Sequence, residues 1–178
     1  MTALALCLAI TAIHPNLDTQ KKSLVCENAQ YIIEASEKYK LDPLIFSALI
    51  WKESRWTPKA ISKANACGLT QVLPKYVPET CKELKTPKIS IETGARVLSY
   101  WIVKRKKKKI ETALACYNAG NKCLDSKGGK AYAKSVLRLS RKYKRWIKIN
   151  YKPTEEQLKM INPPHYDWWN KQTQFANN

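Results

Sequence analysis

Residues 41–55 read LDPLIFSALIWKESR, and this stretch decides the fold. Asp42 can accept hydrogen bonds from the first free amide groups of a helix, and the proline that follows suits the first helical position. Residues 44–51 are apolar on almost every side, which is typical of a helix buried in a core. The run ends in Lys52 and Glu53, so the sequence places Glu53 where a buried helix reaches the surface.

Helical spacing also dominates the rest of the chain. Apolar residues recur at three and four positions in 26–40, 91–102 and 129–148, whereas the alternating pattern of strands is nearly absent. A short helix is expected near 110–117, and prolines interrupt residues 55–90. We therefore predict an all-α fold.

The length of the chain, 178 residues, fits one domain with a single sizeable core. We assign the domain to residues 24–150 and expect residues 151–178, rich in proline and aromatic residues, to form a tail wrapped on it. Residues 1–20 are expected to be a signal peptide or export anchor. Their apolar part is too short to span a bilayer, and no Lys or Arg precedes it, so a first buried helix is the alternative.

The charge balance is strongly basic, because 32 basic and 14 acidic residues give a net charge of +18. Such a surface attracts polyanions. Nucleic acid, anionic lipid headgroups and the anionic bacterial wall all fit, as does a lysine-rich composition that places its charges on solvated faces. Residues 104–109, KRKKKK, are expected at a solvated helix end or loop. Charge alone does not select a partner.

The cysteines form no CxxC pair, and the chain has only two histidines, which argues against a structural zinc site. Disulfides are expected if the chain is exported, and small buried thiols otherwise. Cys116 with Cys123 and Cys67 with Cys81 are the closest pairs, but spacing does not fix connectivity. Removal of Cys7 with a signal peptide would leave an odd number.

The small number of histidines also limits the kinds of catalytic site that the chain can form. Two histidines leave little room for a Ser-His-Asp triad, a Cys-His pair or a zinc amidase, whereas glycoside cleavage needs only carboxyl groups. Glu53 is the best candidate, because burial at the end of an apolar helix raises the pKa of a carboxyl and lets it donate a proton near neutral pH. The alternative is an ordinary surface glutamate.

Four short segments of the chain match motifs of a known protein family, in the order in which the family has them. Residues 48–54 read ALIWKES, residues 58–62 PKAIS, residues 67–74 CGLTQVLP and residues 115–120 ACYNAG. Together they resemble the catalytic domain of the soluble lytic transglycosylases, which belong to the lysozyme-like superfamily with the goose-type lysozymes. The resemblance implies an all-α, lysozyme-like single domain with a C-terminal extension.

The resemblance implies that Glu53 is the catalytic acid/base and that Ser62 lies beside its carboxyl and holds it. Glu53 would protonate the oxygen between MurNAc and GlcNAc, with help from the substrate's acetamido group. The ionised carboxyl would then take a proton from the MurNAc C6 hydroxyl, which closes a 1,6-anhydro ring. This route needs no metal and no cofactor, and it consumes no water.

The remaining matched positions are implied to bind substrate. Gln71 matches a glutamine that contacts sugar in the cleft, and Leu73 stands where the family has a methionine. Tyr117 matches a tyrosine near the catalytic glutamate, and Asn118 lines the same floor. Thr70 also replaces a methionine, a departure that concerns the cleft lining rather than the acid.

Two other functions remain open on the sequence. A muramidase on the same fold would release a reducing sugar and needs a second carboxylate, for which Glu79, Glu83 and Glu92 are candidates by position only. A catalytically idle, basic module that binds wall or nucleic acid is favoured by the charge and disfavoured by the intact catalytic motifs.

For the transglycosylase, we expect peptidoglycan glycan strands as the substrate and the anionic cell wall as the partner of the basic surface. We expect no nucleic acid partner, no stable transmembrane span and a monomer. The expected location is exported, periplasmic or wall-facing, or virion-associated if the chain is phage-encoded. Both a phage lysin and a wall-remodelling enzyme fit this description.

Overall fold

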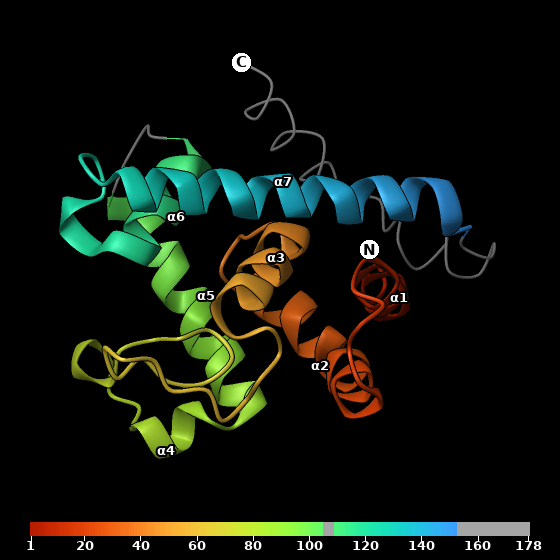
Figure 1. Ribbon diagram of the computed structural model, residues 1–178, viewed down its shortest axis with the longest axis horizontal. Helices are drawn as coiled ribbons and strands as arrows, with labels where there is room; N and C mark the ends of the chain where they lie inside the picture. The colour runs from red at the N-terminus through yellow and green to blue at the C-terminus, as the bar shows by residue number, and fades with distance from the viewer. Residues whose placement is uncertain (105–108, 153–178) are drawn as a thin grey trace.

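The computed structural model describes residues 1–104 and 109–152 (Figure 1). In this part of the chain the secondary structure consists of seven α-helices and two short 3-10 turns, without a strand, so the all-α prediction is confirmed. The helices are α1 (Ala3–Ile13), α2 (Thr19–Lys38), α3 (Pro43–Ser54), α4 (Cys81–Leu84), α5 (Pro87–Lys104), α6 (Ile110–Ala119) and α7 (Lys127–Asn150). The 3-10 turns are Pro74–Tyr76 and Gly120–Lys122. The predicted tail lies outside the described residues from 153 onward.

Helix α3 is the centre of the fold and forms as the sequence predicts. The Asp42 carboxylate accepts hydrogen bonds from the amides of Leu44 (2.7 Å) and Ile45 (3.2 Å), which caps the first turn. Most of the helix is buried, and it ends at Arg55, whose backbone is left-handed. In Figure 1, α3 lies directly beneath α7 and beside α2, and it packs against both helices.

Helix α7 covers this centre. Its buried residues recur at three and four positions, which lays one apolar side of the 24-residue helix across α3, α6 and α1. These residues are Gly129, Ala133, Val136, Leu139, Ser140 and Tyr143. Because α3 and α7 cross, side chains far apart in sequence meet at their contact.

The N-terminal segment packs as a buried helix. Leu6, Ala9 and Ile10 of α1 are fully buried in the core. His14, just after α1, stacks on Trp51 of α3, with ring centroids 3.5 Å apart. The packed helices therefore begin before residue 24, where we placed the start of the domain. Helix α2 begins at Thr19, whereas the sequence predicted a helix from residue 26. Whether the segment is processed as a signal peptide stays a prediction; none of the described helices is long and apolar enough to cross a membrane.

All six cysteines are paired in disulfides. Cys7–Cys26 joins α1 to α2, Cys67–Cys81 joins the loop after α3 to α4, and Cys116–Cys123 joins α6 to the turn before α7. The two pairs closest in sequence are thus disulfides, and the third links the N-terminal helix to the domain.

The contact between α5 and the loop after α3 leaves no room for a side chain at Gly94. A Cβ built there would lie 2.5 Å from the Cβ of Thr70. We expect Gly94→Ala to lower the free energy of unfolding by about 1–3 kcal/mol, because the added methyl overpacks a buried contact. Urea unfolding measures this change.

Gly128→Ala, in the first turn of α7, is the matched control, since the nearest atom to its added Cβ is the Ser126 hydroxyl oxygen at 3.9 Å. We expect it to be neutral or to stabilise by up to about 1 kcal/mol. Equal effects of the two substitutions would contradict the close packing of Gly94.

Candidate active site

Glu53 lies in the last turn of α3, at the crossing with α7. The hydroxyl of Tyr132, on the inner side of α7, donates a hydrogen bond to Oε1 of Glu53 at 2.5 Å. Burial raises the pKa of the Glu53 carboxyl to about 7, and the hydrogen bond from Tyr132 opposes part of that rise. Glu53 is therefore a carboxyl that can hold or release a proton near neutral pH.

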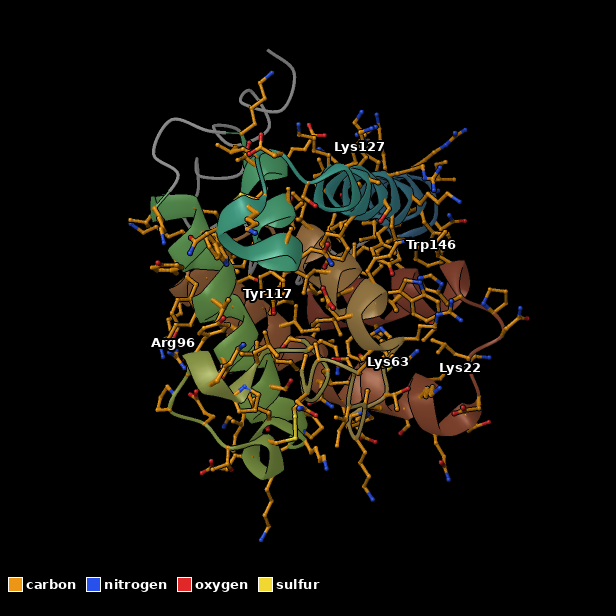
Figure 2. The ribbon with its side chains drawn as sticks, turned by 60° about the vertical axis from the view of Figure 1, so that its left-hand side comes forward. Lys22, Lys63, Arg96, Tyr117, Lys127 and Trp146 are labelled. Atoms are coloured by element: carbon orange, nitrogen blue, oxygen red, sulfur yellow. A yellow bond between two sulfur atoms is a disulfide. The ribbon has the colours of Figure 1, made fainter. Side chains whose placement is uncertain are left out.

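A second tyrosine stands close to the same carboxyl. Tyr117 comes from α6, and its hydroxyl donates to the backbone oxygen of Thr70 at 2.8 Å. Burial, and next the negative charge of Glu53, raise the pKa of Tyr117 well above its ordinary value. The same two causes, burial first, raise the pKa of Tyr132. Figure 2 shows Tyr117 on the side of α6 that faces the middle of the molecule, so three helices supply the three groups.

The loop after α3 is fixed by buried polar contacts. The backbone amide of Thr70 donates to Oγ of Ser90 at 3.1 Å, and its hydroxyl donates to the Ser90 backbone oxygen at 2.8 Å. The disulfide Cys67–Cys81 holds the same loop from the other side. These contacts place the Thr70 carbonyl where Tyr117 reaches it.

Gln71 has a left-handed backbone, with φ at 49°. Its side-chain nitrogen donates to the backbone oxygens of Ala60 (3.1 Å) and Gly68 (2.9 Å). The nitrogen is thus committed to the loop, and the side-chain carbonyl oxygen is the end of the amide that can meet a ligand. Gln71 has a role in holding the loop as well as the role that its motif implies.

The structure places Ser62 differently from the prediction. Its hydroxyl accepts hydrogen bonds from the backbone amides of Ala64 (3.3 Å) and Ala66 (3.0 Å), which closes a turn of the loop. Among the described residues, the hydrogen bond to the Glu53 side chain comes from Tyr132. The partner that we predicted at Ser62 is therefore Tyr132.

Tyr132 was missed as a site residue because the sequence shows it only as one member of the apolar stripe of 129–148. Its position in the helix is that of a core residue, and no neighbouring residue in the sequence indicates a function for its hydroxyl. Only the crossing of α3 and α7 brings the hydroxyl to Glu53, and that crossing is a long-range contact. Of the other predicted residues, Leu73 is half-buried at the start of a 3-10 turn, and Asn118 is exposed on α6.

The three further carboxylates are engaged elsewhere. Glu79 pairs with Arg96 through both oxygens, at 2.7 and 2.8 Å. Glu83 caps α4, and Glu92 accepts hydrogen bonds from Lys38 and Tyr39. Within residues 1–104 and 109–152, no group of three metal-binding side chains is present either.

A separate hollow of about 520 Å³ lies between α2 and α5. Tyr31, Lys38, Lys88 and Glu92 are part of its lining, which includes none of the predicted site residues. We place the candidate active site at Glu53 rather than in this hollow, because Glu53 combines burial, a pKa of about 7 and a hydrogen bond from Tyr132.

A carboxyl whose pKa lies near 7 has the property that general acid/base catalysis requires, and here it lies in an all-α domain. Comparison with known proteins names the family. The sequence model of the transglycosylase SLT domain matches residues 30–138, and the chain belongs to this family. It is also similar to the X polypeptide of Escherichia coli, at 32% identity over 155 residues that cover 78% of this chain and 88% of that protein. The predicted resemblance and the lysozyme-like fold are confirmed.

The environment of Glu53 predicts its titration. We expect its carboxyl to titrate near pH 7, as followed by carbon NMR of the side-chain carboxyl. Tyr132→Phe removes a hydrogen bond that favours the ionised form, so the midpoint should rise further. A midpoint near 4.5 in the wild type, or a fall in the variant, would contradict the geometry.

The raised pKa also predicts how stability depends on pH. Below about pH 4.5 the carboxyl is protonated in both states; as pH rises from there to about 7, the unfolded chain releases the proton first and is favoured. Glu53→Gln should therefore gain stability over the wild type across this window, by roughly 3 kcal/mol at most. Urea unfolding at several pH values tests this, with Glu34→Gln on the exposed face of α2 as the control. A gain in stability that is the same at every pH would contradict the raised pKa of Glu53.

Proposed function

We propose that this protein is a lytic transglycosylase that cleaves the β-1,4 bond between MurNAc and GlcNAc in peptidoglycan, with Glu53 as its acid and base. The observation that carries the proposal is the carboxyl of Glu53, whose pKa of about 7 makes both protonation states accessible at neutral pH. Family membership supplies the substrate class, because the matched domain is a transglycosylase domain.

In the first step, protonated Glu53 donates its proton to the glycosidic oxygen. The bond from that oxygen to C1 of MurNAc breaks, and GlcNAc leaves as an alcohol. The acetamido group of MurNAc assists at C1, so no protein nucleophile is required. Burial of Glu53 supports this step because it keeps the carboxyl protonated until the substrate arrives.

In the second step, the ionised carboxyl accepts the proton of the MurNAc C6 hydroxyl. The C6 oxygen bonds to C1 as the acetamido oxygen leaves C1, which forms the 1,6-anhydro ring, restores the acetamido group and returns Glu53 to its protonated form. Tyr132 acts on Glu53 rather than on the sugar: its hydroxyl, 2.5 Å from Oε1, supports the ionised carboxylate between the two steps. No water molecule is consumed in either step.

The surroundings of Glu53 favour this route over that of a muramidase. A hydrolytic glycosidase of the usual kind needs a second carboxyl about 5–9.5 Å from the first. Glu79, Glu83 and Glu92, the candidates from the sequence, are bound to Arg96, to the cap of α4 and to α2. A mechanism with one carboxylate needs only Glu53, and none of these three candidates has to act beside it.

Substrate contacts are proposed for the residues around the acid. Gln71 would accept a hydrogen bond from a sugar through its side-chain carbonyl oxygen, since the nitrogen is held by the loop. Leu73 and Asn118 would line the cleft. Tyr117 would orient the sugar at Glu53, and Ser62 would shape the loop that carries Gln71.

We further propose that the protein acts outside the cytoplasm on the cell wall, as a monomer, in a phage lysin or a wall-remodelling role. Three disulfides support a location where thiols are oxidised. The net charge of +18 would keep the enzyme near an anionic wall.

Mass analysis of soluble products from purified peptidoglycan tests the proposal. The wild type should release anhydro-muropeptides, and Glu53→Gln should lower the rate by about 10²–10⁴-fold, because general acid/base catalysis contributes about that factor. Glu34→Gln, which changes an exposed glutamate of α2 in the same way, should act like the wild type.

Each contrary result points to a defined alternative. Reducible, hydrated products that disappear in Glu53→Gln would mean a muramidase. Equal activity of wild type and Glu53→Gln would mean that Glu53 is not the acid. No release by the wild type would favour a non-catalytic wall-binding module.

A further inference from the structure

Helix α7 carries an unbroken row of positive charges on its outer side. Seven basic residues recur at three and four positions, so they share one face of the helix. We call this face the α7 basic stripe; it consists of Lys127, Lys130, Lys134, Arg138, Arg141, Arg145 and Lys148, all exposed. The helix contains no acidic residue over its 24 positions.

The stripe is unfavourable for the isolated protein. Like charges three or four positions apart repel each other along a helix, and solvated helix faces usually mix both signs. In the part of the chain that the structure describes, the two ion pairs are Lys38–Glu92 and Arg96–Glu79, neither of which involves the stripe. Among residues 1–104 and 109–152, neither ion pair therefore relieves this repulsion.

The stripe is straight and lies at an edge of the molecule. Figure 1 shows α7 running along the longest axis, outside the other helices. Its 24 residues span about 36 Å. In Figure 2, which looks nearly along α7, many side chains that point away from the molecule on that side end in nitrogen. A row of this kind can meet a planar surface along its whole length.

The positive field continues onto the catalytic helix. Lys52, at the end of α3, has a pKa lowered first by burial and then by the positive charges of Arg138, Arg55 and Lys142. Arg138 is a member of the α7 basic stripe, so the charge of the stripe acts on the end of α3 as well.

The composition of the stripe fits a bilayer surface better than a single-stranded nucleic acid. Clusters of 4–8 Lys or Arg on one helix face are typical of sites that bind anionic lipid headgroups. No aromatic residue interrupts the row, which disfavours the stacking of bases that single-stranded nucleic acids require. No apolar residue does either, so contact would be electrostatic, without insertion.

We propose that the α7 basic stripe docks the protein on the surface of a bilayer that contains anionic phospholipids. Tyr132 faces the opposite side of α7, toward Glu53. Docking through the stripe therefore leaves the catalytic carboxyl facing away from the membrane, about the thickness of one helix (~10 Å) beyond it. The inference concerns a surface and does not depend on the activity proposed for Glu53.

Sedimentation with vesicles of phosphatidylcholine, with and without about 30% phosphatidylglycerol, tests the stripe in the full-length protein. The wild type should bind only the anionic vesicles, and added salt should release it. A variant with Lys134, Arg138, Arg141 and Arg145 all changed to Gln should bind at least about 100-fold more weakly. Its thermal unfolding midpoint should not fall, because repulsion within α7 is reduced.

The matched control changes Lys40, Lys75, Lys82 and Lys88 to Gln, which removes the same charge from exposed positions away from α7. We expect its vesicle binding to fall by less than about threefold. Equal losses in both variants would overturn the proposal in favour of bulk charge.

A second result would also overturn the proposal, and it would show that another polyanion binds the stripe. If the α7 variant kept vesicle binding but lost binding to purified wall sacculi or to duplex DNA, the stripe would serve those partners instead. Glu53→Gln should bind vesicles like the wild type, so a failure of the proposed activity and a failure of docking are observed separately.

Discussion

The hydrogen bond between Tyr132 and Glu53 joins the two helices on which the fold and the site depend. A carboxyl withdrawn from water at the end of α3 would, when ionised, lack a partner if α7 did not bring a hydroxyl to it. The buried row of α7 packs across α3 and fixes the register that makes this meeting occur. The raised pKa of Glu53 is therefore a property of the helix crossing and not of the residue alone.

Around this pair, the loop after α3 and the end of α6 are held by covalent and polar contacts. The disulfide Cys67–Cys81 starts the segment that carries Thr70 and Gln71, and Cys116 precedes Tyr117 directly. The hydrogen bond from Tyr117 to the Thr70 carbonyl then links the two segments. Residues that approach the carboxyl from different helices are thus fixed relative to one another before any substrate binds, which limits the reorganisation that catalysis would require.

Local signals in the sequence predicted the elements that local forces decide. The Asp42 cap, the apolar run of α3 and the placement of Glu53 at its end follow from residues next to one another. Long-range pairing was not accessible in this way: the role expected of Ser62 falls to Tyr132, which no nearby residue distinguishes from a core tyrosine. The N-terminal apolar stretch was equally ambiguous, because its burial against α2 and α7 depends on partners that periodicity does not identify.

Tyr132 follows Glu53 by 79 positions, and it lies on the last described helix of the chain. During synthesis, α3 therefore leaves the ribosome well before the residue that donates a hydrogen bond to Glu53. A nascent or truncated chain that stops short of α7 has the glutamate but neither its hydroxyl partner nor the cover that excludes water. Since burial is what raises the pKa of Glu53, its carboxyl is expected to move toward the ordinary, ionised state in such a chain and to become a proton donor near neutral pH only once α7 has packed.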